Sequence, residues 1–165
     1  MCPDMILRFA VLTVSDRSSR GERPDASGPA LVALIQSQGW QVAKQEIVPD
    51  EIDVIQDALR SWADVGGIDV ILTTGGTGFA PRDVTPEATR AVVERLTPGL
   101  DEAMRAASLK VTPHAMLSRA ISGICKQTLI INLPGSPKGA TENLQVVLPA
   151  LEHAVKLLRE QEAGH

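Results

Sequence analysis

Three largely apolar runs constrain the fold of this chain more than any other feature of its sequence. They lie at Phe9–Val14, Ile68–Thr73 and Thr128–Leu133. Such runs are typical of parallel strands buried on both faces, because a strand with one solvated face would alternate apolar and polar residues. Segments with helical periodicity separate the runs. The sequence therefore predicts an α/β fold: a three-layer α/β/α domain around a mostly parallel, Rossmann-like sheet.

Turn and cap residues delimit the remaining elements. A further strand is expected at Trp40–Val48, and a small hairpin at Ala120–Ile124 and Leu129–Asn132. Helices are expected at Pro29–Gln38, Ile52–Ala63, Thr85–Leu96 and Leu100–Lys110. A terminal helix from Glu142 to Glu160 should be kinked or interrupted at Pro149, with Gln161–His165 frayed.

Composition predicts a single domain without a membrane segment. The 165 residues suit one domain, with its core at about residues 8–160, and 44% of them are hydrophobic but only 2% aromatic, so aliphatic side chains must fill the core. A net charge of −4 argues against nucleic-acid or anionic-membrane partners. Cys2 and Cys125 form no CxxC pair, and no apolar stretch reaches spanning length. We expect a reduced, cytoplasmic protein.

A glycine-rich loop, Gly75-Gly76-Thr77-Gly78, follows one of the apolar strands and precedes a helix that starts near Thr85. Glycines let backbone amides approach an anion closely, and a helix N-terminus adds partial positive charge. No lysine follows as in a P-loop, and Pro81 stands where the dinucleotide fingerprint needs its third glycine. The loop predicts phosphate binding of another type, although the same pattern also occurs in plain tight turns.

Polar residues at the carboxyl ends of the predicted strands should meet at one edge of the sheet. These ends carry Ser15-Asp16, Pro49-Asp50, Gly75–Asp83 and Pro134–Lys138, with cations at Arg17, Arg82 and Lys138. Together they suit a phosphorylated substrate and a nucleotide with bound Mg²⁺. Simpler interpretations stay open: Asp50 as a helix N-cap, Asp83 as an Asx turn, and Arg82 and Lys138 as solvated charges. The long Ser18–Gly28 loop could close over a ligand.

Four motifs, taken in their order along the chain, indicate a particular protein family. They are Thr13–Arg17 (TVSDR), Thr74–Thr89 (TGGTGFAPRDVTPEAT), Ala115–Arg119 (AMLSR) and Asn132–Lys138 (NLPGSPK). Together they resemble the molybdopterin adenylyltransferases of molybdenum cofactor biosynthesis, and the amino-terminal domain of gephyrin. The resemblance implies a homotrimer that binds molybdopterin and Mg-ATP, forms adenylylated molybdopterin and releases pyrophosphate. A molybdenum insertase would be a downstream partner.

The resemblance also assigns site residues. Asp50 and Asp83 match the acidic positions that the family needs for catalysis and Mg²⁺ binding. The positions that match substrate and nucleotide contacts are Ser15, Asp16, Gly75, Gly76, Thr77, Gly78, Ser118, Arg119, Pro134, Gly135, Ser136 and Lys138. For five of these residues the sequence does not separate substrate contact from loop architecture: Ser15, Asp16, Ser118, Arg119 and Lys138.

Two other classes of function remain compatible with the same residues. One is a non-catalytic molybdopterin-binding or trimeric scaffold protein, as the likeness to gephyrin allows. The other is a nucleotide-binding regulatory domain related to the competence-damage proteins. The motifs separate neither the two bacterial branches of the family nor molybdenum from tungsten.

Overall fold

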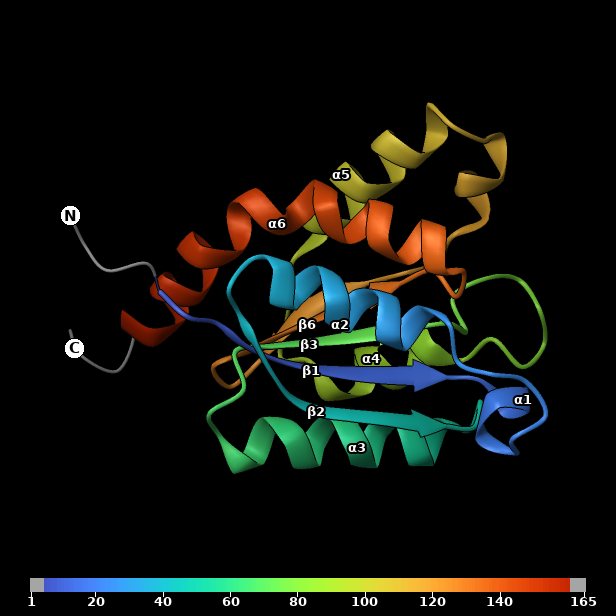
Figure 1. Cartoon of the computed structure of the whole chain (residues 1–165), viewed down its shortest axis with the longest axis horizontal. Helices are drawn as coiled ribbons and strands as arrows, with labels where there is room; N and C mark the ends of the chain where they lie inside the picture. The colour runs from blue at the N-terminus through green and yellow to red at the C-terminus, as the bar shows by residue number, and fades with distance from the viewer. Residues whose placement is uncertain (1–4, 161–165) are drawn as a thin grey trace.

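The computed structural model describes residues 5–160, which form a six-stranded sheet between two layers of helices (Figure 1). The strand order is β2-β1-β3-β6-β5-β4; β1, β2, β3 and β6 are parallel, β5 runs antiparallel to β6, and the edge strand β4 runs antiparallel to β5. The strands are β1 (Arg8–Val14), β2 (Gln41–Val48), β3 (Val70–Thr74), β4 (Arg95–Leu96), β5 (Ser122–Cys125) and β6 (Thr128–Leu133). The predicted three-layer α/β fold and the β5–β6 hairpin are confirmed.

Helices cover both faces of the sheet (Figure 1). One layer holds α2 (Ser27–Ser37), α5 (Pro98–Leu109) and α6 (Pro137–Glu160), and the other holds α3 (Ile52–Val65) and α4 (Thr85–Val92). Two short helices, α1 (Asp16–Ser19) and the 3-10 helix η1 (Pro113–Leu117), lie in connections. Within residues 5–160, no helix is both long and apolar enough to cross a bilayer.

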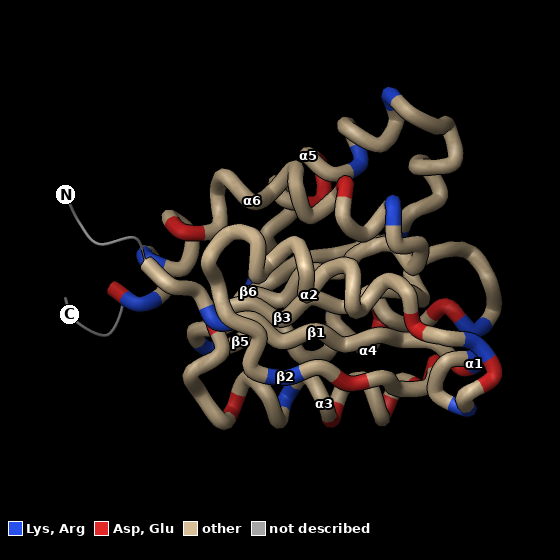
Figure 2. Tube along the Cα trace, viewed as in Figure 1, with Lys and Arg blue, Asp and Glu red and all other residues tan. Residues whose placement is uncertain are grey.

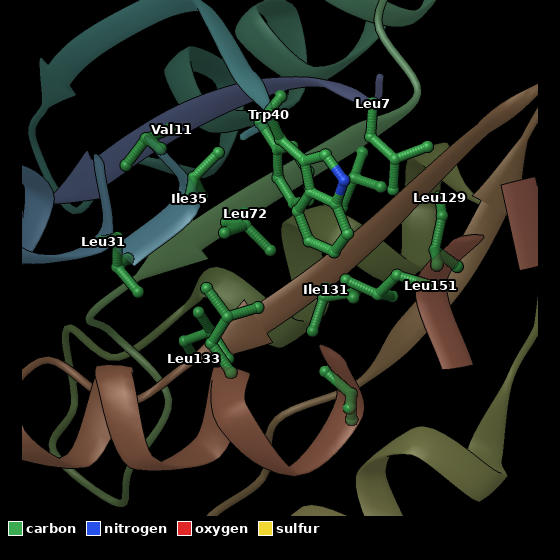
Figure 3. Packing of buried hydrophobic residues seen from close by; sticks show 14 of the residues in the cluster. Leu7, Val11, Leu31, Ile35, Trp40, Leu72, Leu129, Ile131, Leu133 and Leu151 are labelled. Atoms are coloured by element: carbon green, nitrogen blue, oxygen red, sulfur yellow. The ribbon is translucent and has the colours of Figure 1, made fainter. Parts of the chain in front are cut away.

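The core is aliphatic and lies on both sides of the sheet. Leu72 and Ile131 pack toward α2 and α6, whereas their neighbours Ile71 and Ile130 pack toward α3 and α4. This alternation follows from the pleat, which sends successive side chains to opposite faces. Figure 3 shows the first of these clusters, with Leu72 and Ile131 near the indole of Trp40. Double-sided burial explains why the strand sequences are nearly continuous apolar runs.

The helix after the glycine loop is shorter than the sequence predicts. It ends at Val92 instead of Leu96, and Arg95–Leu96 forms β4 against β5. Glu94 and Thr97 donate backbone hydrogen bonds to the carbonyls of Ile124 and Ser122, which lie much further along the chain. A pairing partner that distant cannot be read from local periodicity, so the prediction was wrong here.

Two further boundaries also differ from the prediction. The Ser18–Gly28 segment contains the end of α1 and the start of α2, so the connection between these helices spans residues 20–26. The terminal helix begins at Pro137, not Glu142, and continues through Pro149 to Glu160. Of the two alternatives predicted for Pro149, a kink or an interruption, the interruption is therefore wrong. Pro149 lies on an exposed face, where water can satisfy the carbonyl that loses its helical partner. The predicted fraying of residues 161–165 and Cys2 lie outside the described residues.

We predict that Leu72→Ala destabilises the protein by about 3 kcal/mol, because Leu72 is fully buried in a central strand and its truncation leaves a cavity. Leu157→Ala is the matched control, since Leu157 is 51% exposed, and should cost less than about 1 kcal/mol. Urea unfolding followed by circular dichroism measures both values. Equal losses in the two variants would contradict the assigned core.

Candidate functional site

The four parallel strands end at the same edge of the sheet, beside α1, and a cleft of about 840 Å³ lies there. Charged residues of both signs gather around α1 at this edge (Figure 2). Segments that follow β1, β2, β3 and β6 all contribute to the lining, together with residues 23–27. The predicted meeting of strand ends at one edge is therefore confirmed.

Gly75 brings three strand ends together. Its φ of +102° is a left-handed conformation, and a Cβ at this position would lie 2.3 Å from the Val14 carbonyl oxygen. Its amide donates to the carbonyl of Leu133, and a Cβ on Gly135 would lie only 3.3 Å from the Gly75 Cα. Only glycine fits at Gly75, because any side chain would push β1 away from β3.

The loop after Gly75 has free amides and occupied carbonyls. Thr85 donates its hydroxyl to the carbonyl of Gly75 at 2.9 Å and its amide to that of Gly76 at 3.1 Å. Within residues 5–160, the amides of Gly76, Thr77 and Gly78 have no protein acceptor. Consecutive unpaired amides in a tight loop form an anion-binding site. The geometry therefore supports phosphate binding, and Thr85 stabilises the loop through these two hydrogen bonds.

Asp50 is not a helix cap. The N-cap of α3 is Glu51, and Asp50 instead exchanges hydrogen bonds with Asp16. The Asp16 amide donates to Asp50 Oδ2 at 2.8 Å, and the Asp50 amide donates to Asp16 Oδ1 at 3.0 Å. This reciprocal pair joins the ends of β1 and β2. One carboxylate oxygen of Asp50, Oδ1, is left without a protein donor among the described residues.

Arg82 is 56% exposed, but it is also ion-paired and so is more than the solvated charge considered above. Its guanidinium donates to both carboxylate oxygens of Asp16, at 2.6 and 3.1 Å, and also to Glu51 and the carbonyl of Asp50. The hydrogen bond from Arg82 lowers the pKa of the Asp16 carboxyl group. Because both oxygens of Asp16 have protein partners, this residue organises the cleft, although it also lines it.

Asp50 and Asp83 both face the glycine loop. A Cβ on Gly76 would lie 3.1 Å from Asp50 Oδ1, and one on Gly78 would lie 2.9 Å from Asp83 Oδ2. Burial raises the pKa of Asp50, and the charges of Asp16 and Asp83 raise it further. Asp83 also accepts a hydrogen bond from the Ala80 amide at 3.1 Å. The predicted Asx turn is wrong, because it needs the Thr85 amide, which donates to the Gly76 carbonyl instead.

The donor set of this cleft fits Mg²⁺. The oxygens of Asp50 and Asp83 are hard ligands, and a nearby cation would relieve the crowding of negative charge that raises the pKa of Asp50. Residues 5–160 contain no cluster of three or more His, Cys, Asp or Glu side chains that could hold a metal alone. Such an ion would therefore complete its shell with water and nucleotide phosphate, as Mg²⁺ usually does.

Two predicted serines lie at helix starts inside the cleft. Ser15 caps α1 by accepting from the Ser18 amide, and Ser136 accepts from the Gly139 amide at the start of α6. Lys138, by contrast, does not line the cleft. Its side chain is 80% exposed, and its Nζ lies 3.9 Å from Oε1 of Glu142.

Arg119 stabilises the glycine loop through hydrogen bonds to its backbone. It donates to the carbonyls of Gly78 and Asp83 at 2.8 and 2.6 Å and pairs with Glu87. These bonds assign Arg119 to loop architecture, because its guanidinium is directed at protein groups.

The remaining predicted residues line a second cleft of about 320 Å³, between α5, η1 and the start of α6. Thr77, Gly78, Ser118 and Pro134 contribute to it, and Ser136 lines both clefts. The predicted residues are therefore divided between two neighbouring clefts that flank the glycine loop.

Sequence reasoning missed Asp25. Its carboxylate accepts from the Thr13 hydroxyl at 2.7 Å and from the Gly28 amide at 3.0 Å, and it lines the first cleft. Asp25 thus fastens the α1–α2 connection to β1. The position of Asp25, three residues before Gly28, could have indicated a helix cap. Nothing in the sequence indicated its contact with Thr13 on β1.

Comparison with known proteins identifies the family. Residues 10–153 match the family model described as a probable molybdopterin binding domain. The chain belongs to this family. The molybdopterin adenylyltransferase of Helicobacter pylori J99 is 44% identical over 154 residues, which cover 92% of this chain and 88% of that protein. A place in molybdenum cofactor biosynthesis, expected from the motifs, is thereby confirmed.

Two other members of the family extend the comparison. The crystal structure of the molybdopterin biosynthesis enzyme MoaB from Thermus thermophilus has a TM-score of 0.88 and 52% identity, covering 93% of this chain and 96% of that one. Gephyrin of Dictyostelium discoideum is 50% identical over 161 residues, which are 92% of this chain but 22% of gephyrin. The chain thus spans about a fifth of that relative.

We predict that Asp50→Asn is at least as heat-resistant as the wild type at pH 7 without Mg²⁺. The amide oxygen can still accept from Asp16, while the charge disfavoured by burial is gone. Because the pKa of Asp50 is raised in the folded protein, its ionised form costs stability at neutral pH. That cost disappears as the pH falls and Asp50 is protonated.

The difference in Tm between variant and wild type should therefore be largest near pH 7 and vanish below about pH 4. Differential scanning calorimetry over this range measures it. A variant that melts well below the wild type at pH 7 would show that the Asp50 carboxylate stabilises the fold.

Proposed function

We propose that this protein is a molybdopterin adenylyltransferase, which transfers AMP from Mg-ATP to the terminal phosphate of molybdopterin and releases pyrophosphate. The observation that carries the proposal is the glycine loop with free amides, faced by Asp50 and Asp83 and flanked by two clefts. The family assignment and the name of the Helicobacter pylori relative support it.

The two clefts suit two substrates. The larger one carries the acidic residues and the start of α2, a helix whose N-terminal partial charge favours phosphate, so we assign ATP to it. The smaller cleft would receive the pterin, with its phosphate directed to the glycine loop. Ser136 lines both clefts, which supports a reaction at their junction.

The chemistry requires alignment more than a protein nucleophile. A terminal phosphate oxygen of molybdopterin forms a bond to the α-phosphorus of ATP, and the bond from that phosphorus to the oxygen bridging to the β-phosphate breaks. The bridging oxygen leaves with pyrophosphate. The amides of Gly76, Thr77 and Gly78 would hold phosphate oxygens during this transfer. Among residues 5–160 the cysteine is Cys125, which is buried, so it is not available for a covalent step.

Asp50 and Asp83 would hold Mg²⁺, with Asp16 and Arg82 fixing the position of Asp50. When bound, the ion supplies positive charge that neutralises phosphate oxygens and polarises the reacting phosphorus. Without it, the acidic side chains at this edge would repel ATP.

We predict that Asp83→Asn lowers ATP-dependent pyrophosphate release by at least about a hundredfold and leaves molybdopterin binding largely intact, because the lost charge acts on the transfer and not on the pterin. Asp57→Asn, an exposed position on α3, is the control and should be unaffected. A coupled pyrophosphate assay with molybdopterin and Mg²⁺ measures turnover. Near-normal turnover of the Asp83 variant would remove this residue from the mechanism.

The second candidate is a non-catalytic molybdopterin-binding protein, which the identity to gephyrin favours. It predicts that the wild-type protein binds molybdopterin and releases no pyrophosphate from ATP. The same assay therefore separates the two functions.

We also propose that the protein is a cytoplasmic homotrimer that delivers its product to a molybdenum insertase. The trimer follows from the family resemblance, and exposed apolar side chains on the α5–η1 projection support an interface there: Leu109, Val111, Met116 and Leu117. Light scattering during gel filtration should give three times the 17.6 kDa chain mass. Val111→Asp should lower the mass, whereas Leu157→Asp at the far end of α6 should not; a monomeric wild type would refute the trimer.

A further inference from the structure

The smaller cleft contains a buried carboxylate that the proposed transfer of AMP does not use. Asp101 lies in the first turn of α5, is only 5% exposed, and lines this cleft. Its Oδ2 accepts from the Ser122 amide at 3.0 Å, and its Oδ1 accepts from the Ser122 hydroxyl at 2.7 Å. These bonds fasten α5 to β5 and fix the orientation of the carboxylate.

The two hydrogen bonds from Ser122 fill about half of the acceptor positions of the Asp101 carboxylate. A carboxylate has about four acceptor positions, and Ser122 occupies one on each oxygen. Among the described residues, Asp101 has no salt bridge. Arg105, one turn along α5, donates to the carbonyls of Ser118 and Ala120 instead. A buried carboxylate with open acceptor positions is stabilised by a ligand that brings N–H donors.

Other polar groups of this cleft are already used. The amide of Asn143 donates to the Gly139 carbonyl and accepts from Ser108, and Asn132 is bonded to Thr73 and Thr89. Glu142 also lines the cleft, but it is about half exposed and lies near Lys138. Asp101 is therefore the buried side chain of this cleft that still has unoccupied hydrogen-bond acceptor positions.

We propose that Asp101 reads the 2-amino-4-oxopyrimidine edge of the pterin, accepting hydrogen bonds from its 2-amino group and the adjacent ring N–H. The inference rests on the proposed function, which places the pterin in this cleft. Two parallel N–H groups matching the two oxygens of one carboxylate give recognition that depends on the amino group. A ring with oxygen at position 2 would place an acceptor oxygen opposite an acceptor oxygen of Asp101. Asp101 thus determines specificity and takes no part in the transfer of AMP.

The test compares two probes that differ only at position 2: 6-hydroxymethylpterin phosphate and the corresponding lumazine phosphate, which carries oxygen in place of the amino group. Calorimetric titration of the wild-type protein without ATP should show that the pterin probe binds about ten- to a hundredfold more tightly. Equal affinities would overturn the proposal.

Asp101→Asn should abolish this preference, because its amide presents a donor and an acceptor in place of two acceptors. Glu102→Gln, which removes the neighbouring exposed carboxylate on α5, should keep it. A preference retained in Asp101→Asn would overturn the proposal. If that variant does not fold, the ¹³Cγ resonance of Asp101 in the wild-type protein decides, since it should shift with the pterin probe and stay in place with the lumazine probe.

Failure of this inference and failure of the proposed function are distinguishable. Absent pyrophosphate release with a clear pterin preference would refute the adenylyltransferase and retain the role of Asp101. Normal release with equal binding of the two probes would retain the enzyme and refute that role.

Discussion

The close approach of Gly75 to the carbonyl of Val14 is the constraint on which the rest of the site depends. A side chain at Gly75 would meet that oxygen at 2.3 Å, so β1 and β3 could not end side by side. The amide of Gly75 adds β6 through the carbonyl of Leu133. The loops that follow β1, β3 and β6 therefore leave the sheet close together, which brings their backbone amides and carboxylates to one place.

Charge at this edge is organised by pairing inside the protein. Arg82 neutralises Asp16, and Asp16 in turn fixes Asp50 through a reciprocal pair of hydrogen bonds from each backbone amide to the other residue's carboxylate. Asp50 keeps an unused oxygen, and its raised pKa reflects burial and the acidic neighbours. The protein thus maintains an electrostatically unfavourable group at the position proposed for Mg²⁺, as expected of a site that trades stability for function.

The sequence predicted the architecture well because local signals were consistent with the global fold. The apolar runs gave the buried strands, and Gly75–Gly78 gave the loop. Errors occurred where a distant partner decided the outcome. Arg95–Leu96 continued a helical pattern but pairs with β5, and Pro149 should break a helix but lies on an exposed face of α6. Local propensity is a weak prior in such places, because tertiary contacts outweigh it.

The candidate site divides in the same way. Residue types and spacing alone determined that Asp50, Asp83 and the glycine loop lie at one edge, since parallel strands place their carboxyl ends together. Only the tertiary structure decided which groups remain free to act: Asp16 and Arg119 are occupied by protein partners, whereas Asp101 is buried with acceptor capacity to spare. The physical reason is that a hydrogen bond depends on distance and direction between groups far apart in the chain, and a sequence specifies those only through its complete fold.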